Sequence, residues 1–165
     1  MPQRERIGLG GGCHWCTEGI FVSLAGVKRV EQGWIASLPP HEQPSEAVIV
    51  HFDPEAITVA ELLAVHLETH AATSDHSLRG KYRSAVYYFD PLVVTRYRAV
   101  LRELQAEYGD PLQTLLLPFA SFTSSLPEHL DYYRSDPQRP FCRRYITPKL
   151  DALRQRRPEL FAPVG

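Results

Sequence analysis

Apolar residues along this chain follow two spacings, one typical of strands and the other typical of helices. Dense or alternating apolar runs predict strands over residues 6–9, 27–36, 47–52, 82–89 and 115–117. Helical spacing predicts helices over residues 15–24, 58–70, 91–108 and 128–134, and a terminal helix from residue 148. Thr58 precedes the second of these helices, and Glu61 three positions later completes a capping box.

The order of these elements predicts an α+β fold. Strands that follow one another closely pair most readily as antiparallel neighbours, and the helices between them cover the sheet. A chain of 165 residues is long enough to bury a core and short enough for one domain. We therefore expect a single domain over residues 1–165, with a mostly antiparallel sheet flanked by helices.

Charge and composition narrow the classes of function. The 18 Lys and Arg residues nearly balance the 19 Asp and Glu residues, so no surface for tracking nucleic acid is expected. No apolar run is long enough to span a membrane, and residues 1–12 contain no apolar signal core. The chain is therefore expected in the cytoplasm, where its 3 cysteines stay reduced.

Cys13 has the surroundings of a reactive thiol. It follows three glycines after a predicted strand and stands at the start of a predicted helix. The glycines allow a tight turn, and the positive end of a helix favours a thiolate over a thiol. His14 and Trp15 can wall an apolar pocket beside it. The competing interpretation is a small, inert cysteine buried in the turn, and the residues alone leave both open.

Two further patterns suggest other chemistry. Cys13 and Cys16 form a C-x-x-C motif, which is typical of a thioredoxin-like redox pair or of half a zinc site. His66 and His70 share one helix face, but a Glu does not follow the first as in zinc proteases. We expect no metal site and no cofactor.

Residues 11–18, Gly-Gly-Cys-His-Trp-Cys-Thr-Glu, resemble the Gly-Cys-Phe-Trp signature of the A-type peptide methionine sulfoxide reductases. Further segments resemble the same family in order along the chain: residues 24–27, 45–48, 52–54, 82–85 and 132–142. The similarity covers nearly all of residues 5–150. It implies the family's α+β fold, with a ferredoxin-like core.

The resemblance also implies an activity, the reduction of methionine S-sulfoxide, peptide-bound or free, to methionine. Cys13 would attack the sulfoxide sulfur, Glu46 would protonate the departing oxygen, and Tyr82 would hydrogen-bond to that oxygen. The sulfenic acid left on Cys13 would form a disulfide with Cys142, with Cys16 as the competitor, and thioredoxin would reduce it. From the residues alone, an exposed strand-end carboxylate is the commoner interpretation of Glu46, and a packing partner is an equal interpretation of Tyr82. We expect a monomer.

The expected substrate pocket is lined by His14, Trp15 and Trp34, and two of these depart from the family pattern. His14 replaces the phenylalanine that helps to hold the substrate methyl group. Trp34 replaces a tyrosine, and an indole N–H donates a hydrogen bond but cannot accept one.

Two other segments also depart from the family. Residues 77–81 replace its Asp-x-Gly-x-Gln, and Asp75 lies two positions too early to take the place of the aspartate. Residues 43–45 replace its Thr-Gly-His. Three alternatives therefore stay open: a non-catalytic or regulatory relative, a C-x-x-C thiol-disulfide oxidoreductase, and a metal-binding protein.

Overall fold

The structure, a computed structural model, describes residues 4–70, 72 and 82–162. In these residues a six-stranded sheet has the order β5-β4-β1-β3-β2-β6. Its strands are β1 (Glu5–Gly10), β2 (Val27–Ala36), β3 (Ser45–Phe52), β4 (Ala85–Tyr88), β5 (Leu115–Pro118) and β6 (Ser121–Ser124). The α-helices are α1 (His14–Val22), α2 (Val59–Glu68), α3 (Val94–Gln105), α4 (Tyr132–Ser135) and α5 (Thr147–Arg156). Short helical turns are η1 (Pro91–Val93), η2 (Pro127–His129), the π-helical η3 (Cys142–Ile146) and η4 (Pro158–Leu160).

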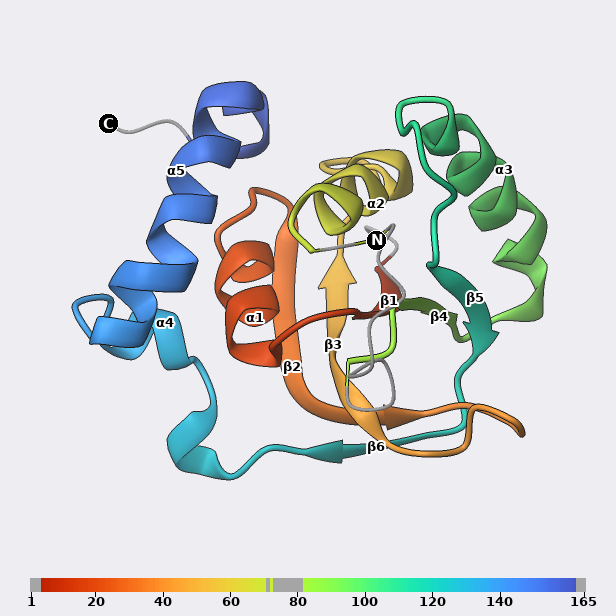
Figure 1. The fold of residues 1–165 in the computed structure, drawn as a ribbon, viewed down its shortest axis with the longest axis horizontal. Coiled ribbons are helices and arrows are strands. Elements are labelled where there is room, and N and C mark those ends of the chain that lie inside the picture. Colours follow the sequence, from red (N-terminus) through yellow and green to blue (C-terminus); the bar gives the residue numbers. More distant parts are fainter. Residues whose placement is uncertain (1–3, 71, 73–81, 163–165) are drawn as a thin grey trace.

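The sheet confirms the predicted α+β class. Its neighbouring strands pair antiparallel except β4 and β5, which run parallel. The pairing of β2 with β3 places Trp34 opposite Glu46. Figure 1 shows α1 and α2 on the same side of the curled sheet, and α3 beside β5. The register thus sets two expected site residues next to each other under the start of α1.

The core lies between the sheet and the helices α1 and α2. Alternate residues of β1 and β3, such as Leu9 and Val48, point to this side and are fully buried. Phe21 of α1 and Leu62 of α2 pack into the same cluster. Helix α2 begins with the predicted capping box, since Thr58 and Glu61 exchange hydrogen bonds. Burial of one helix face and one sheet face is what the apolar spacings predicted.

Several boundaries differ from the prediction. The strand predicted over residues 82–89 is regular only in β4, and β6 was not predicted because Ser121–Ser124 contains one apolar residue. The helix predicted over residues 128–134 is two short helical turns, because Asp131 adopts a left-handed conformation with φ of 53°. Among the described residues, none of the helices is both long and apolar enough to cross a membrane.

Candidate active site

A cavity of about 440 Å³ opens at the amino end of α1. All six residues predicted for catalysis and for the pocket line it: Cys13, His14, Trp15, Trp34, Glu46 and Tyr82. They come from the start of α1, the paired strands β2 and β3, and the segment before β4. Three residues that were not predicted complete the lining: Leu126, His129 and Phe141. We call the segment that carries them, residues 126–141, the pocket arm.

Cys13 is the N-cap of α1. Its carbonyl accepts hydrogen bonds from the N–H groups of Cys16, at 3.1 Å, and Thr17, at 3.2 Å. The turn before it needs glycine, because Gly11 has φ of 149° and a Cβ there would lie 2.5 Å from the His70 ring. The predicted tight turn into a helix start is therefore present, and it leaves Cys13 half-buried beside the cavity.

The surroundings of Cys13 favour its thiolate. Its pKa is lowered to about 7, chiefly because the Cys16 thiol donates a hydrogen bond to the Cys13 sulfur. The N–H groups of Trp15 and Cys16 lower it further, against burial and the charge of Glu46. The same hydrogen bond and burial raise the pKa of Cys16. At neutral pH a large fraction of Cys13 is thus the nucleophilic thiolate, with the neutral Cys16 thiol in contact with it.

Glu46 is a buried carboxyl group, 7% exposed, near the start of β3. Its Oε1 accepts a hydrogen bond from the backbone N–H of His14 at 3.2 Å. The His14 Nε2 lies 3.4 Å from the same oxygen. The His14 Nδ1 donates to the carbonyl oxygen of Gly33 at 2.9 Å. The interpretation of Glu46 as an exposed strand-end residue is therefore wrong.

Aromatic rings form one wall of the cavity. The Trp15 ring stacks on Tyr132, with centroids 4.3 Å apart and planes 11° apart, and Phe141 meets it edge-on at 5.4 Å. The His14 and Trp34 rings, which also line the cavity, meet edge-on at 5.1 Å. This lining can enclose a small apolar group beside the Cys13 sulfur.

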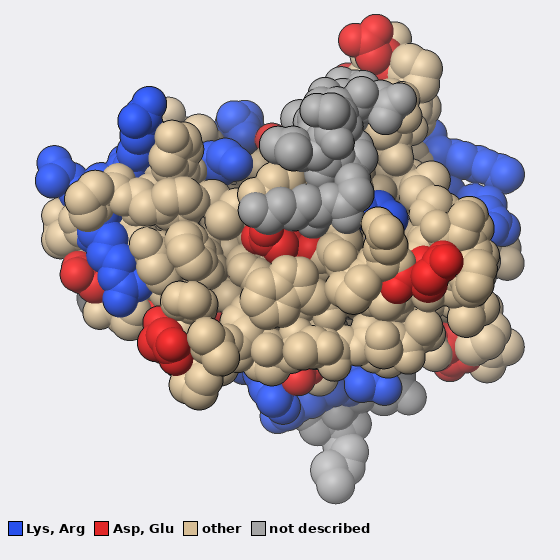
Figure 2. Space-filling view, turned by 60° about the horizontal axis from the view of Figure 1, so that its bottom comes forward, with Lys and Arg blue, Asp and Glu red and all other residues tan. Residues whose placement is uncertain are grey.

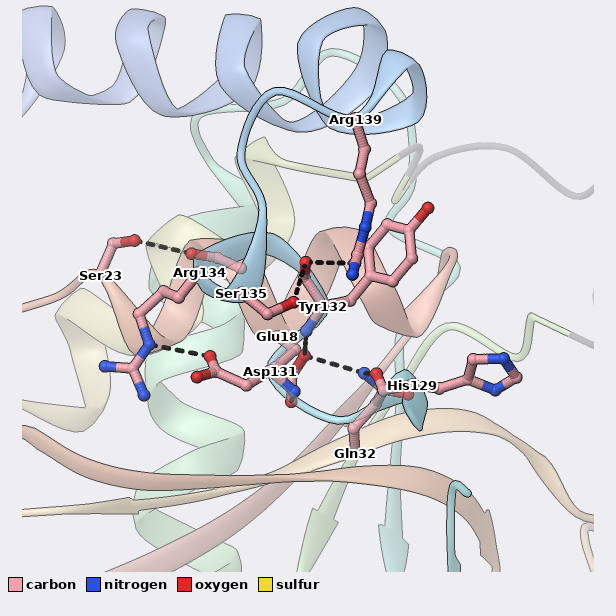
Figure 3. A network of polar contacts seen from close by, with 10 residues as sticks. Glu18, Ser23, Gln32, His129, Asp131, Tyr132, Arg134, Ser135 and Arg139 are labelled. Atoms are coloured by element: carbon pink, nitrogen blue, oxygen red, sulfur yellow. Dashed lines mark hydrogen bonds and ion pairs between the residues drawn. The ribbon is translucent and has the colours of Figure 1, made fainter. Parts of the chain in front are cut away.

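Glu18, one turn into α1, holds the pocket arm in place (Figure 3). Its carboxylate is 3% exposed and accepts the backbone N–H groups of Asp131, at 2.9 Å, and Tyr132, at 3.1 Å. Gln32 donates from its Nε2 to the Glu18 Oε1 at 2.8 Å and to the carbonyl oxygen of His129 at 2.9 Å. Burial raises the pKa of Glu18, against the three donors that favour its charged form. Sequence reasoning missed this anchor, because its partners are 113 and 114 positions away along the chain.

The two candidate resolving cysteines lie behind the cavity. Cys16 is 7% exposed and Cys142 is fully buried, and both belong to the core cluster against which Cys13 packs. All three cysteines are free thiols. Residues 136–139 form the expected turn, but Cys142 itself lies in the π-helical η3. Burial raises the pKa of Cys142.

The remaining sequence features lie elsewhere. His66 contacts the Gly10 carbonyl at 2.7 Å, and His70 contacts the Ser84 hydroxyl at 2.8 Å. Within the described ranges, no group of three or more His, Cys, Asp or Glu side chains is placed to hold a metal ion. Asp75 and residues 77–81, where the sequence departs from the family pattern, lie outside the described residues.

Figure 2 shows the face reached by tilting the bottom of Figure 1 forward. The described residues across its middle are mostly uncharged, with a few Asp and Glu patches, and Lys and Arg side chains lie at its two ends and along its lower edge. This part of the surface carries no continuous basic track of the kind that nucleic acids require.

The chain is similar to known proteins over nearly its whole length. The family model described as peptide methionine sulfoxide reductase matches residues 5–160. The chain belongs to the peptide methionine sulfoxide reductase family. This confirms the resemblance carried by residues 11–18 and by the ordered segments after them.

Individual reductases of the family support the assignment. The peptide methionine sulfoxide reductase MsrA of Thermus thermophilus is 35% identical over 99% of this chain and 100% of its own length. Methionine sulfoxide reductase A of Corynebacterium diphtheriae superposes with a TM-score of 0.68 at 26% identity, over 83% of this chain and 77% of that one. Mxr1 of Saccharomyces cerevisiae, solved in complex with Trx2, gives a TM-score of 0.62 at 20% identity, over 79% and 85% of the two chains. The predicted fold is thereby confirmed.

Proposed function

We propose that this chain reduces methionine S-sulfoxide, peptide-bound or free, to methionine. The observation that carries the proposal is the single cavity lined by Cys13, Glu46 and Tyr82. These are the positions at which the family resemblance places the nucleophile, the acid and the group that hydrogen-bonds to the oxygen. Cys13 also has a pKa of about 7, which suits a thiol that must attack as a thiolate near neutral pH.

The first step transfers the oxygen. The Cys13 thiolate attacks the sulfoxide sulfur, while Glu46 protonates the sulfoxide oxygen and Tyr82 donates a hydrogen bond to it. The S–O bond of the substrate breaks and the protonated oxygen passes to the Cys13 sulfur. The transient bond between the two sulfurs breaks as methionine leaves, and Cys13 is left as a sulfenic acid. One thiolate, one sulfoxide and one proton thus give one sulfenic acid and one thioether. The Cys13 sulfur loses the two electrons that the methionine sulfur gains.

The aromatic wall would hold the substrate by its methyl group. Trp15, packed against both Tyr132 and Phe141, presents a rigid apolar surface next to the nucleophile. His14 stands where the family signature has phenylalanine, so one side of this enclosure is polar. The altered lining supports a substrate preference that differs from that of relatives with an all-apolar pocket.

The second step restores the thiols. The resemblance favours Cys142 as the first thiol to attack the sulfenic acid, whereas the thiol contact favours Cys16. We assign the first disulfide to Cys16, because its thiol already donates to the Cys13 sulfur and Cys13 is the extended N-cap rather than part of the helix. This disulfide forms from the sulfenic acid and the Cys16 thiol with loss of one water. Cys142, buried in the same cluster, would then exchange into this disulfide.

The reductant would be thioredoxin, which reduces such a disulfide by thiol-disulfide exchange. A reducing compartment, the cytoplasm, fits three free cysteines and a mechanism that begins from thiols. We further propose that the chain acts as a monomer, as a single domain over residues 1–165, and without a cofactor.

The test is reduction of a peptide containing methionine S-sulfoxide, with dithiothreitol and separately with thioredoxin. We expect turnover with both reductants and none with the methionine R-sulfoxide peptide. A protein whose Cys13 is readily alkylated at pH 7 but which leaves both epimers unreduced would be a non-catalytic relative, and the proposal would be wrong.

A second candidate function rests on the contact between Cys13 and Cys16. A C-x-x-C pair with one thiol of pKa about 7 is also the arrangement of a thiol-disulfide oxidoreductase. Such an enzyme would reduce insulin disulfides and leave sulfoxides untouched. Comparing the two substrates under one reductant separates the candidates.

A further inference from the structure

His14 is held by both of its ring nitrogens inside the cavity. The ring is buried, Nδ1 lies 2.9 Å from the Gly33 carbonyl oxygen, and Nε2 lies 3.4 Å from the Glu46 Oε1. The family signature has phenylalanine here, which bears no proton. No step of the proposed oxygen transfer uses this ring, although its Nε2 lies within ion-pair distance of the proposed acid.

The Gly33 contact fixes where the ring carries its hydrogen. A carbonyl oxygen only accepts, so Nδ1 must be the N–H that donates. Nε2 is then the nitrogen that faces Glu46, 3.4 Å from its Oε1. When the pair holds a proton, either Nε2 is bare beside a protonated carboxyl group, or Nε2 is protonated beside a carboxylate. Both arrangements place one transferable proton between His14 and Glu46.

The hydrogen bond from the His14 backbone N–H to Glu46 explains why the acid needs a neighbour that holds a proton. Glu46 accepts the His14 N–H at the start of α1, and such a bond stabilises a carboxylate more than a neutral carboxyl group. Oxygen transfer nevertheless needs a proton at this place. A second proton-holding group next to the carboxylate resolves the conflict, and His14 supplies it.

We propose that His14 is a proton-storing positioning residue. It shares one proton with Glu46, so that this acid has a proton to donate near neutral pH. This inference rests on the proposed sulfoxide reduction. When the oxygen leaves the substrate sulfur, the proton of the pair goes to that oxygen. The pair is left as neutral imidazole and carboxylate, and solvent protonates it again before the next turnover.

Other titratable groups also line this cavity: Cys13, Tyr82 and His129. The Cys13 thiolate attracts the proton of the pair, and the charge of Glu46 acts in return on Cys13. The His129 ring contacts Trp15, with ring centroids 5.5 Å apart. The reactive state needs the thiolate and the stored proton together, which predicts a bell-shaped pH dependence.

The first experiment measures the pH profile of a single turnover, as methionine formed per Cys13 without added reductant. We compare the unmodified protein with His14→Phe and His14→Gln. Both variants are expected to lose rate on the alkaline side, on the order of ten-fold at pH 8, and to approach the unmodified rate at pH 5. Alkylation of Cys13 at each pH, measured in parallel, corrects for any change in thiolate fraction.

The glutamine variant separates storage of a proton from shape. Its side chain can still donate to the Gly33 carbonyl but cannot take up a proton. If His14→Gln restores the whole profile, or if His14→Phe lowers the rate equally at every pH, His14 only fills space and the inference is wrong.

The second experiment does not depend on activity. Nitrogen-15 NMR of His14 should find the neutral ring protonated on Nδ1, and the chemical shift of Nε2 should change in Glu46→Gln. A neutral ring protonated on Nε2, or the same Nε2 chemical shift in both proteins, would overturn the pairing. If the unmodified protein fails to reduce sulfoxides, the proposed function falls, while this measurement still decides whether the proton pair exists.

Discussion

The two sides of the cavity are built in different ways. The Cys13 side is a local structure, because the glycine turn, the N-cap and the Cys16 contact all lie within residues 10–16. The pocket arm is a distant segment, held against α1 through Glu18 and through the stacking of Trp15 on Tyr132. The reactivity of the Cys13 thiol thus depends on residues that are close in the sequence, while the shape of the substrate enclosure depends on long-range contacts. Substitutions on the two sides should therefore fail in different ways.

The largest expected effect is on the local side. Cys13→Ser should abolish reduction of methionine S-sulfoxide with dithiothreitol and with thioredoxin, because no other thiol lines the cavity among the described residues. The assay is methionine release, followed by chromatography. Cys142→Ser is the matched control and should keep one stoichiometric turnover. Methionine release by Cys13→Ser beyond the background of reagent alone would place the nucleophile elsewhere.

Next in size is the loss of the acid. Glu46→Gln keeps the shape of the side chain but cannot donate the proton to the departing oxygen. The single-turnover rate at pH 7 should fall by roughly 10²–10⁴-fold, the usual range for general acid catalysis. Cys13 alkylation should persist, since the charge of Glu46 raises the pKa of Cys13 and its removal favours the thiolate. A loss of only two- or three-fold would remove Glu46 from the chemistry.

A smaller effect is expected from Cys16→Ala. The hydrogen bond from Cys16 is the largest cause of the lowered pKa of Cys13, so without it the pKa should rise from about 7 toward its ordinary value. The iodoacetamide rate at pH 7 should fall on the order of ten-fold, and the pH profile of alkylation should move to higher pH. Cys142→Ser should leave that profile in place. An unchanged profile in Cys16→Ala would assign the thiolate to the helix start alone.

Loss of the Glu18 anchor of the pocket arm should lower both the stability of the protein and its affinity for the substrate. Glu18→Ala leaves the N–H groups of Asp131 and Tyr132 without their acceptor and removes one of the two acceptors of the Gln32 amide. We expect the free energy of unfolding to fall by about 2–4 kcal/mol, from desolvated donors without partners. KM should rise more than the single-turnover rate at saturation falls. If Glu18→Ala also lowered the rate of Cys13 alkylation by the same factor, the two sides of the cavity would not be independent.

The smallest expected effect is on the pH dependence of the free energy of unfolding. Burial raises the pKa of Glu18 in the folded protein, so the folded state binds more protons than the unfolded state between the two pKa values. This part of the stability is present below the unfolded pKa and is lost as pH rises through the folded pKa. Glu18→Gln should remove that decline, seen as a difference between the two denaturation curves across pH. Parallel curves would contradict the raised pKa.

The difference between the local Cys13 side and the distant pocket arm also explains which features could be predicted from the sequence. The turn at Gly11 and Cys13 was predictable because glycines, a strand pattern and a helix pattern adjoin there. Trp34 lies in a predicted strand and Glu46 directly precedes one, and the family resemblance supplied the role of Glu46. Their opposition in the β2–β3 register became visible only in the structure.

The pocket arm could not be predicted in this way. Leu126, His129 and Phe141 belong to no long apolar pattern, and the left-handed Asp131 interrupts the helix that the spacing suggested. Their positions follow from Glu18, whose buried carboxylate has no signal in its own stretch of sequence. Strand β6 was missed for a similar reason, since four mostly polar residues form it by pairing with β2.

The central claim is that Cys13 takes the oxygen from methionine sulfoxide within this cavity. The most direct measurement uses a Cys16→Ser, Cys142→Ser double variant, in which no second cysteine can remove the sulfenic acid. After one addition of methionine S-sulfoxide peptide, dimedone labelling and mass spectrometry would count the sulfenic acid on Cys13 against the methionine released. We predict one label on Cys13 for each methionine formed. Methionine released without a label on Cys13, with the label stable under the same conditions, would contradict the account.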